Sequence, residues 1–318
     1  MNDVKEVKLP DVQNRVDPRG IGLYRVGVTN VKFPTRILRK NGTFSNISAG
    51  VKLFANLPQE AKGHNLSRFN EVLVDFGNNN TLLSSTTLPH LLTEMQKRLG
   101  STDVYARFEF DYYIDKQAPA SKKIAPMAYA CAMTGIKKKE DTYFILEVNT
   151  IAASVCPCSR EMSLLEHLEY SDLEWNVPSK EEDPEEYYKN VTKKAFEDAS
   201  NVEMAQQVGM GAHNQRSYIK VELLLDSNNT LWIEDVIPLI EACASAPTYP
   251  ILKRPDEKFV TELGYNNAKF SEDIARDVQV TLQNTPQILA WSLKVRNEES
   301  IHPYDVMSSS KSDNWNFY

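Results

Sequence analysis

The sequence predicts an α+β fold built on antiparallel β-sheet, and three observations support this class. Long segments in both halves of the chain alternate apolar and polar residues with the two-residue period of a half-buried strand. Amphipathic helical segments accompany these strands. The order strand pair, helices and strand occurs in both halves, so the sequence predicts an internal structural duplication without a repeat of individual residues.

The first predicted module covers residues 21–164 and follows an N-terminal arm at residues 1–20. Asn41-Gly42 joins its first two strands, and this dipeptide is typical of a tight hairpin. A helix follows in TTLPHLLTEMQKRLG, where Gly100 can end it. Strand patterns occupy, in order, GLYRVGVTNVKFPTRIL, GTFSNISAGVKLFANLP, DVYARFEFDYYI, KKIAPMAYACAMTGI and DTYFILEVNTIAASV.

An acidic segment at residues 165–208 separates the two modules. Pro184 follows Asp183 there as in the first turn of a capped helix, which predicts a helical insertion at the surface. A solvated acidic face without further function is the alternative. The second module covers residues 209–305 and precedes a C-terminal tail at residues 306–318. Its strands are RSYIKVELLLD and ILAWSLKVRNEES, and its helices are TLWIEDVIPLIEACASA and KFSEDIARDVQVTLQN.

The composition indicates a globular protein and excludes several classes of partner. The chain has 318 residues, and 36 Lys and Arg against 43 Asp and Glu give a formal charge of −7. This balance argues against general nucleic-acid binding but permits a local basic pocket for one anion. No apolar run approaches the ~20 residues of a membrane span, and the first residues lack the apolar core of a secretory signal. The 4 scattered cysteines form no disulfide framework, so we expect a cytoplasmic protein with reduced thiols.

The stretch VCPCSREMS at residues 155–163 places Cys156 and Cys158 on either side of one proline. A disulfide between them would be strained, because the loop that it closes is too short. Two inert, buried thiols are one interpretation, although polar residues follow the proline. The other interpretation is a thiolate that is held rigidly for a metal ion or for chemistry.

Among the 5 histidines, His213 is the best candidate for a functional residue. It lies in GMGAHNQRS, after two glycines and before a dense polar run, which are unusual surroundings for a merely buried imidazole. Cys156, His213 and a carboxylate would supply three protein ligands and leave one metal position open, as in catalytic zinc sites. The segment KRPDEK at residues 253–258 offers such carboxylates, and a charged surface turn is its structural alternative.

Several motifs together resemble one family, the type IB GTP cyclohydrolases. The resemblance rests on CPCS at residues 156–159, GAHNQRS at 211–217, YPILKRPDEKFVTE at 249–262 and ESIH at 299–302, with KGHNLSRF at 62–69 as a looser match. It implies the tunnelling fold with two modules per subunit, a homotetramer, and active sites at subunit interfaces. It also implies conversion of GTP and water to 7,8-dihydroneopterin triphosphate and formate, the first step toward tetrahydrofolate.

The resemblance implies a divalent metal, zinc, manganese or iron, and assigns its ligands to Cys156, His213 and Glu257. Such a metal ionises water near neutral pH, as the attack on the weakly electrophilic C8 of a purine requires. Glu299 and His302 correspond to the family's proton-transfer pair. A carboxylate and an imidazole three residues apart can share the proton transfers that open the purine ring.

The resemblance assigns the carboxylate that anchors guanine to Glu272, in KFSED. Cys158 is then a nearby second thiol in a supporting or catalytic role. The family's KGxHMSR reads KGHNLSR here, which moves the histidine to His64 and leaves Arg68 as the contact expected from this loop. The acidic insertion is a second departure from the family pattern. The triphosphate needs cations, and the candidates are Arg68, Arg216, Lys253 and Arg254.

Two other functions are compatible with these residues. A different enzyme of the same fold, such as a deazapurine nitrile reductase, would use a cysteine nucleophile without metal and would depend on NADPH. A zinc-stabilised purine-binding module would unfold when its metal is chelated. A catalytic metal site would instead lose activity and keep its fold.

Overall fold

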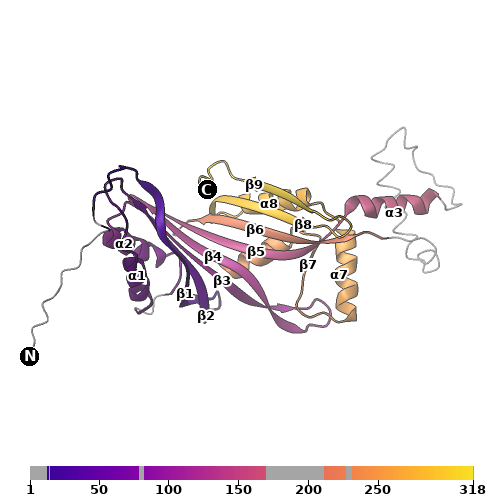
Figure 1. Ribbon diagram of the computed structural model, residues 1–318. Coiled ribbons are helices and arrows are strands. Elements are labelled where there is room, and N and C mark those ends of the chain that lie inside the picture. The colour runs from indigo at the N-terminus through magenta and orange to yellow at the C-terminus, as the bar shows by residue number, and fades with distance from the viewer. Residues whose placement is uncertain (1–12, 14, 79–81, 170–210, 227–230, 318) are drawn as a thin grey trace, which may run out of the picture.

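The computed structural model describes residues 13, 15–78, 82–169, 211–226 and 231–317 of the chain. Nine strands form one antiparallel sheet in the order β1-β2-β3-β4-β5-β6-β8-β9, with the short strand β7 beside β5 (Figure 1). The strands are β1 (Leu23–Leu38), β2 (Phe44–Leu57), β3 (Asp103–Gln117), β4 (Ile124–Lys138), β5 (Asp141–Val155), β6 (Asn214–Leu225), β7 (Ala246–Pro247), β8 (Ile288–Glu298) and β9 (Asp305–Lys311). The helices are α1 (Ser67–Asn78), α2 (Leu88–Leu99), α3 (Pro157–Glu169), α6 (Ile233–Glu241), α7 (Arg254–Asn266) and α8 (Ser271–Gln283).

The order of elements repeats, as expected for a fold of two modules. Two strands, two helices and two strands occur as β1, β2, α1, α2, β3, β4 and again as β5, β6, α6, α8, β8, β9, with α3, β7 and α7 added to the second set. This repeat divides the chain at residues 139–140, between β4 and β5. In this repeat β5 begins the second set and pairs with β6 from Asn214 to Leu224, whereas the expected boundary follows residue 164.

The predicted strand periodicity is confirmed by burial. In β2, Ala49, Val51, Leu53 and Ala55 are at most 1% exposed and alternate with residues on the opposite face. The same core continues under both helix pairs, and it includes Phe69 and Leu92 from the first pair and Ile237 and Val278 from the second. One continuous apolar layer thus unites the two modules.

The predicted turn residues have the expected conformations. Gly42 lies in the turn between β1 and β2 and has φ +81°. In the same turn, the Asn41 side chain accepts a hydrogen bond from the Thr43 backbone N–H at 3.0 Å. Gly100 has φ +63° directly after α2, which is the left-handed conformation that ends helices. The local sequence therefore predicted both the hairpin and the end of the helix.

Several elements were not predicted. The segment read as a polar loop around Arg68 contains the start of α1, and its buried residues Phe69, Val72, Leu73 and Phe76 have helical spacing. The segment KRPDEK, for which a charged surface turn was the structural alternative, is the beginning of α7.

The expected C-terminal tail at residues 306–318 is wrong, because β9 pairs there with β8 and Trp315 is only 4% exposed. The serine-rich sequence of β9 carries little apolar signal, so pairing with β8 decides its structure. The expected insertion at residues 165–208 lies outside the described residues, apart from its start in α3.

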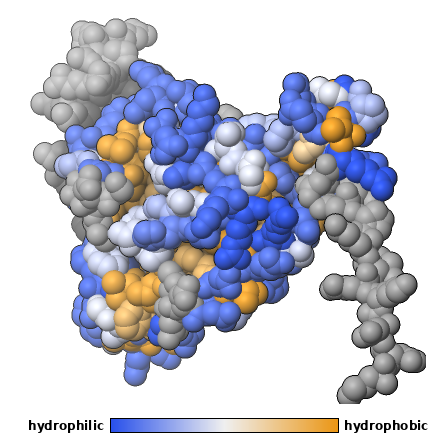
Figure 2. All heavy atoms as spheres, turned by 90° about the vertical axis from the view of Figure 1, so that its left-hand side faces the viewer, coloured by the Kyte–Doolittle hydropathy of each residue, from blue (hydrophilic) through white to orange (hydrophobic). Residues whose placement is uncertain are grey.

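The surface seen from the end that carries α1 and α2 is mostly hydrophilic and shows separate apolar patches (Figure 2). β1 and β9 are the outermost strands of the sheet in the described chain. Leu23 and Tyr24 of β1 are 50% and 66% exposed, and Met307 of β9 is 66% exposed. Outer strands with exposed apolar side chains are typical sites for pairing with another chain.

Asp256 attaches the first turn of α7 to the turn between β3 and β4. Its side chain is fully buried, and its carboxylate accepts hydrogen bonds from the backbone N–H groups of Ala120 and Ser121, both at 2.7 Å, and of Lys253 at 2.8 Å. Burial alone would raise the pKa of Asp256. The hydrogen bonds from Ser121, Lys253 and Ala120 outweigh burial and hold this pKa well below its ordinary value.

Replacement of this carboxylate should make the protein less stable near neutral pH. Asp256→Asn keeps the size but turns an amide N–H toward backbone donors, so we expect a lower Tm at pH 7. A depressed folded-state pKa contributes stability above the unfolded-state value of about 3.9 and loses it as the pH falls below that value. The difference in Tm between wild type and variant should therefore shrink in acid.

Thermal unfolding followed by circular dichroism between pH 7 and pH 3 tests this prediction. Asp313→Asn is the matched control, because Asp313 is exposed. Equal Tm values for wild type and Asp256→Asn at pH 7 would contradict the assigned role.

Candidate active site at the ends of β5, β6 and β8

The strand register brings three predicted site residues together at the ends of three neighbouring strands. Val155, the last residue of β5, pairs with Asn214, the first of β6, and Arg216 pairs with Glu298 at the end of β8. In antiparallel strands, the end of one strand lies beside the start of its neighbour. Cys156, His213 and Glu299, which lie one residue beyond these three strand ends, are therefore neighbours although 143 positions separate the first from the last.

Backbone and hydroxyl hydrogen bonds join Cys156 to His213. The Cys156 N–H donates to the His213 carbonyl at 3.1 Å. Ser159 donates its hydroxyl to the Cys156 carbonyl at 3.2 Å and accepts the His213 N–H at 3.3 Å. Pro157 begins α3, where its missing N–H costs no helical hydrogen bond. The motif CPCS thus ends a strand, starts a helix and holds Cys156 beside His213.

Gln215 connects His213 to Glu299 and was not identified from the sequence. It is 8% exposed, and its amide nitrogen lies 2.9 Å from Glu299 Oε2 and 3.3 Å from His213 Nδ1. The Ser300 hydroxyl lies 3.5 Å from the same ring nitrogen. One signal could have identified Gln215: it is two residues after His213 in a strand, so both side chains lie on the same side of β6.

Cys158 is exposed in the first turn of α3. Burial of the sulfur raises the pKa of Cys158, and the neighbouring Cys156 and Glu161 raise it further. Cys158 is therefore a protonated thiol near neutral pH, and a protonated thiol is a poor nucleophile. This state does not favour a mechanism in which Cys158 attacks the substrate.

Glu272 lies in the first turn of α8, close to these strand ends. The backbone N–H of Lys269 donates to the Val155 carbonyl at 3.0 Å, and Val155 directly precedes Cys156. Glu272 is exposed, and one of its oxygens accepts the hydroxyl of Ser271 at 2.9 Å. The carboxylate predicted to anchor guanine therefore lies three residues after Lys269, which is hydrogen-bonded directly to β5.

Glu257, Lys253 and Arg254 are exposed at the opposite end of α7. The helix approaches the site at Gly264, where an added Cβ would lie 3.3 Å from a methyl group of Val155. Glu257 is seven residues earlier, about 10 Å along the helix axis at 1.5 Å per residue. Within the described residues, no three His, Cys, Asp or Glu side chains lie close enough together to hold a metal ion. A single chain thus brings Cys156 and His213 together and leaves Glu257 apart.

Cys156 and His213 are nevertheless suitable ligands for a transition metal. Thiolate and imidazole are preferred by zinc and by other first-row metals, and both side chains are partly exposed at the strand ends. A third ligand has to come from a carboxylate that reaches the same strand ends.

Arg68 and His64 lie at the other end of the molecule, beside α1 and α2 (Figure 1). Arg68 donates to the carbonyl of Arg98 at 3.1 Å, near the end of α2. The His64 ring is 9% exposed, lies 3.0 Å from the Asn56 carbonyl and packs edge-on against Phe69. His64 therefore has a structural role within its own chain.

His302 and Arg216 are both exposed and lie close in sequence to the ends of β8 and β6. His302 is exposed and stacks on Tyr304 with ring centroids 5.0 Å apart. Arg216 is exposed on the face of β6 opposite to Gln215. Neither side chain is buried, so both can contact a ligand or a second subunit.

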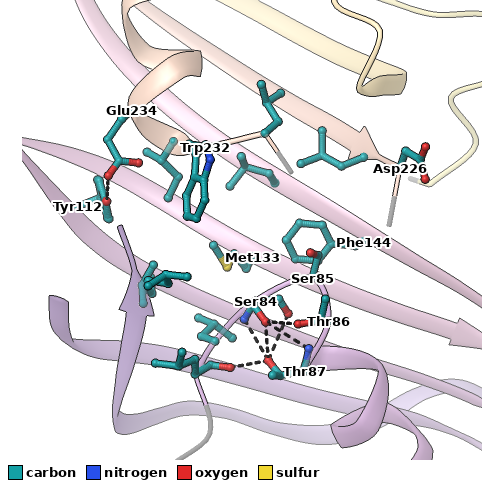
Figure 3. A pocket seen from close by; sticks show the side chains of 18 residues that line it. Ser84, Ser85, Thr86, Thr87, Tyr112, Met133, Phe144, Asp226, Trp232 and Glu234 are labelled. Carbon is teal, nitrogen blue, oxygen red and sulfur yellow. Dashed lines mark hydrogen bonds between the residues drawn. The ribbon is translucent and has the colours of Figure 1, made fainter. Parts of the chain in front are cut away.

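An apolar cavity of about 260 Å³ opens between the turn before α2 and the start of α6 (Figure 3). Met133, Phe144 and Trp232 form its wall, and the Tyr112 hydroxyl donates to Glu234 at 2.6 Å on one side. None of the predicted site residues lines this cavity. No helix within the described residues combines the length and the apolar character needed to cross a membrane.

Residues 9–308 match the family described as type I GTP cyclohydrolase folE2. A GTP cyclohydrolase FolE2 from Magnetococcus marinus is 33% identical over 301 residues, which cover 95% of each chain. That of Geobacter sulfurreducens is 33% identical over 305 residues, covering 96% of this chain and 98% of its own. That of Syntrophotalea carbinolica is 34% identical over 296 residues, covering 93% and 92%.

Among solved structures, a uricase from Arthrobacter globiformis superimposes with a TM-score of 0.51 at 5% sequence identity. The superposition covers 94% of this chain and 96% of the uricase. At this identity the likeness shows the fold alone. It confirms the bimodular tunnelling fold that the sequence motifs imply.

Proposed function

Because the chain belongs to the type I GTP cyclohydrolase folE2 family and is a GTP cyclohydrolase, we propose that it opens GTP at the ends of β5, β6 and β8. The observation that carries this location is the contact of Cys156 with His213, with Glu299 held beside His213 by Gln215. The products are 7,8-dihydroneopterin triphosphate and formate, and the step belongs to folate biosynthesis.

Cys156 and His213 would hold a divalent metal, zinc, manganese or iron, with Glu257 as the third ligand. A metal bound there supplies Lewis-acid activation of water for attack on C8. Glu257 completes this set only when the first turn of an α7 helix, from this chain or from a second copy, approaches Cys156. The hydrogen bonds of Ser159 hold the backbone of Cys156 beside that of His213 before the metal binds.

The other residues would bind GTP and move protons. Glu272, which is exposed, would accept the N–H and amino groups of the guanine edge. Glu299 and His302 would transfer protons at the imidazole ring and later at the ribose. Cys158 stays a neutral thiol next to Cys156 and supports the site. The triphosphate would be bound by Arg68, Arg216, Lys253 and Arg254.

A homotetramer with sites between subunits accounts for the separation of these residues. Arg68 lies at the end of the sheet opposite to Cys156 (Figure 1), so it reaches a triphosphate only in a second copy. The outer strands β1 and β9 expose apolar side chains that such contacts would cover. The free thiols of Cys131, Cys156, Cys158 and Cys243 agree with a cytoplasmic location.

GTP turnover tests the proposed reaction directly. Purified protein with GTP and zinc, manganese or iron should release one formate for each GTP and form a fluorescent pterin after oxidation. Chelation should abolish turnover while the circular dichroism spectrum is kept, since Cys156, His213 and Glu257 all lie outside the apolar core of the described chain. GTP consumption without formate would contradict opening of the ring at C8.

Metal content tests the three ligands. Cys156→Ser, His213→Ala and Glu257→Gln should each lower the metal bound per subunit and abolish turnover, because each removes one of three protein ligands. Elemental analysis after reconstitution gives the metal content. Glu262→Gln is the control, because Glu262 is exposed on the same helix. Full metal occupancy in a ligand variant would remove that residue from the set.

Steady-state kinetics test the proton-transfer pair. His302→Ala and Glu299→Gln should lower kcat by roughly 10²-fold or more, the usual scale for loss of general acid–base catalysis. His302→Ala should keep its metal content and its affinity for GTP, because His302 is neither a ligand nor a guanine contact. His90→Ala in α2 is the control, since His90 is exposed far from the strand ends. An unchanged kcat in His302→Ala would exclude this residue from proton transfer.

A further inference from the structure

A chain of four buried polar side chains lies beneath the site on the helix-covered face of β5, β6 and β8. Ser154 and Ser217 are 0% exposed, Asn297 is 3% exposed and Gln215 is 8% exposed. Apolar side chains such as Ala152, Ile219 and Val295, all at most 1% exposed, occupy the same face around them. Thr150 of β5 is a further buried polar residue on this face, whereas the four residues named first are linked to one another by hydrogen bonds.

The hydrogen bonds of this chain run in one direction. The Ser217 hydroxyl donates to Asn297 Oδ1 at 2.8 Å, and the Asn297 amide donates to Ser154 Oγ at 3.2 Å. The Ser154 hydroxyl donates in turn to Gln215 Oε1 at 3.3 Å. Each interior member accepts from one neighbour and donates to the next, so the bonds polarise one another in the same sense.

The Gln215 amide turns its NH₂ group toward the site. Its Oε1 accepts the Ser154 hydroxyl, and its NH₂ nitrogen lies 2.9 Å from Glu299 Oε2 and 3.3 Å from His213 Nδ1. A rotated amide would place two oxygen acceptors, Oε1 and the Glu299 carboxylate, against each other. The Glu299 carboxylate, which can only accept, therefore selects this orientation, and the hydroxyl and amide groups beneath it run in the matching direction.

Fold stability alone does not explain this arrangement. Buried amides and hydroxyls lose their hydration, and replacing both partners of a buried pair by apolar groups of the same shape is close to neutral for stability. Four linked polar groups on an apolar face are therefore not needed to close the core. They do have one consequence at the surface, which is a fixed donor group between a predicted metal ligand and a predicted proton carrier.

We propose that Gln215 is a positioning residue that holds the Glu299 carboxylate in its working orientation, and that Ser154, Asn297 and Ser217 anchor the Gln215 amide from the buried side. This inference deepens the proposed function and rests on it, because it needs Glu299 to act in proton transfer. Hydrogen bonds to the carboxylates around metal sites fix the placement of these groups.

The test removes one link of this hydrogen-bonded chain at a position away from the reacting groups. Ser154→Ala removes one hydroxyl, leaves the volume of the core nearly unchanged and frees the Gln215 amide to rotate. Gln215→Leu removes the positioning group itself. Both variants should lower kcat by roughly 10-fold or more, the scale found for outer-shell partners in metal sites. Binding of cobalt(II), followed by its absorption spectrum, should stay unchanged, because the Gln215 amide donates to the proposed proton carrier Glu299. The KM for GTP should stay unchanged, since neither side chain is a proposed substrate contact.

Gln279→Leu is the matched control. Gln279 on α8 accepts the Ser310 hydroxyl at 2.9 Å, so this variant also removes one amide that links two elements. It should change Tm without changing kcat or cobalt(II) binding. If Ser154→Ala does not fold, Asn297→Asp takes its place, because the carboxylate keeps the size but cannot donate to Ser154.

Wild-type kcat in folded Ser154→Ala and Gln215→Leu would overturn the inference and leave the proposed function intact. A lower Tm in these variants without a lower kcat would overturn it equally, because it would show a purely structural role. A lower kcat that accompanies lost cobalt(II) binding would overturn it as well, because the effect would then act through the metal. A wild-type protein that neither binds cobalt(II) nor consumes GTP would overturn the proposed function and this inference with it.

Discussion

The register of three antiparallel strands is the constraint on which the rest of the structure depends. β6 pairs with β5 on one side and with β8 on the other, so the end of β5, the start of β6 and the end of β8 coincide. A shift of one residue in either ladder would turn every side chain of a strand to the opposite face. Both the apolar core and the position of Cys156 beside His213 would then be lost. The same pairing creates the fold and the site.

The two faces of these strands carry different kinds of polar groups. On the open face, Glu147 is 6% exposed and forms ion pairs with Arg107 at 2.7 Å and with Lys220 at 3.0 Å. Burial alone would raise the pKa of Glu147, but the attraction of Arg107 and Lys220 outweighs it and lowers the pKa. On the covered face, Ser154, Gln215, Ser217 and Asn297 are uncharged and are linked by hydrogen bonds. The strands of the site thus carry an ion-pair network on the open face and uncharged, hydrogen-bonded groups beneath the helices.

A single chain holds only part of the proposed site, and this agrees with the tunnelling fold. The sheet carries α1 and α2 at one end and α3 and α7 at the other (Figure 1), so cations on α1 and thiols beside α3 cannot meet within one copy. Within the second module, α7 is attached by Asp256 to the turn between β3 and β4, which keeps Glu257 away from Cys156. A site shared between copies would couple assembly to activity, because neither copy alone would hold every ligand of GTP.

Local sequence determined much of the fold. The two-residue period identified the long strands, Asn41-Gly42 identified a hairpin and Gly100 a helix end, because these signals depend on neighbouring residues only. The motifs around Cys156 and His213 likewise carried the family and the chemistry. Tertiary structure decided the rest. β9 has a serine-rich sequence and is a strand because β8 offers it an edge, while Gln215 gains its role from partners on β5 and β8 that are distant in sequence. Contacts between distant segments carry no local periodicity, so only the folded chain shows which polar groups meet.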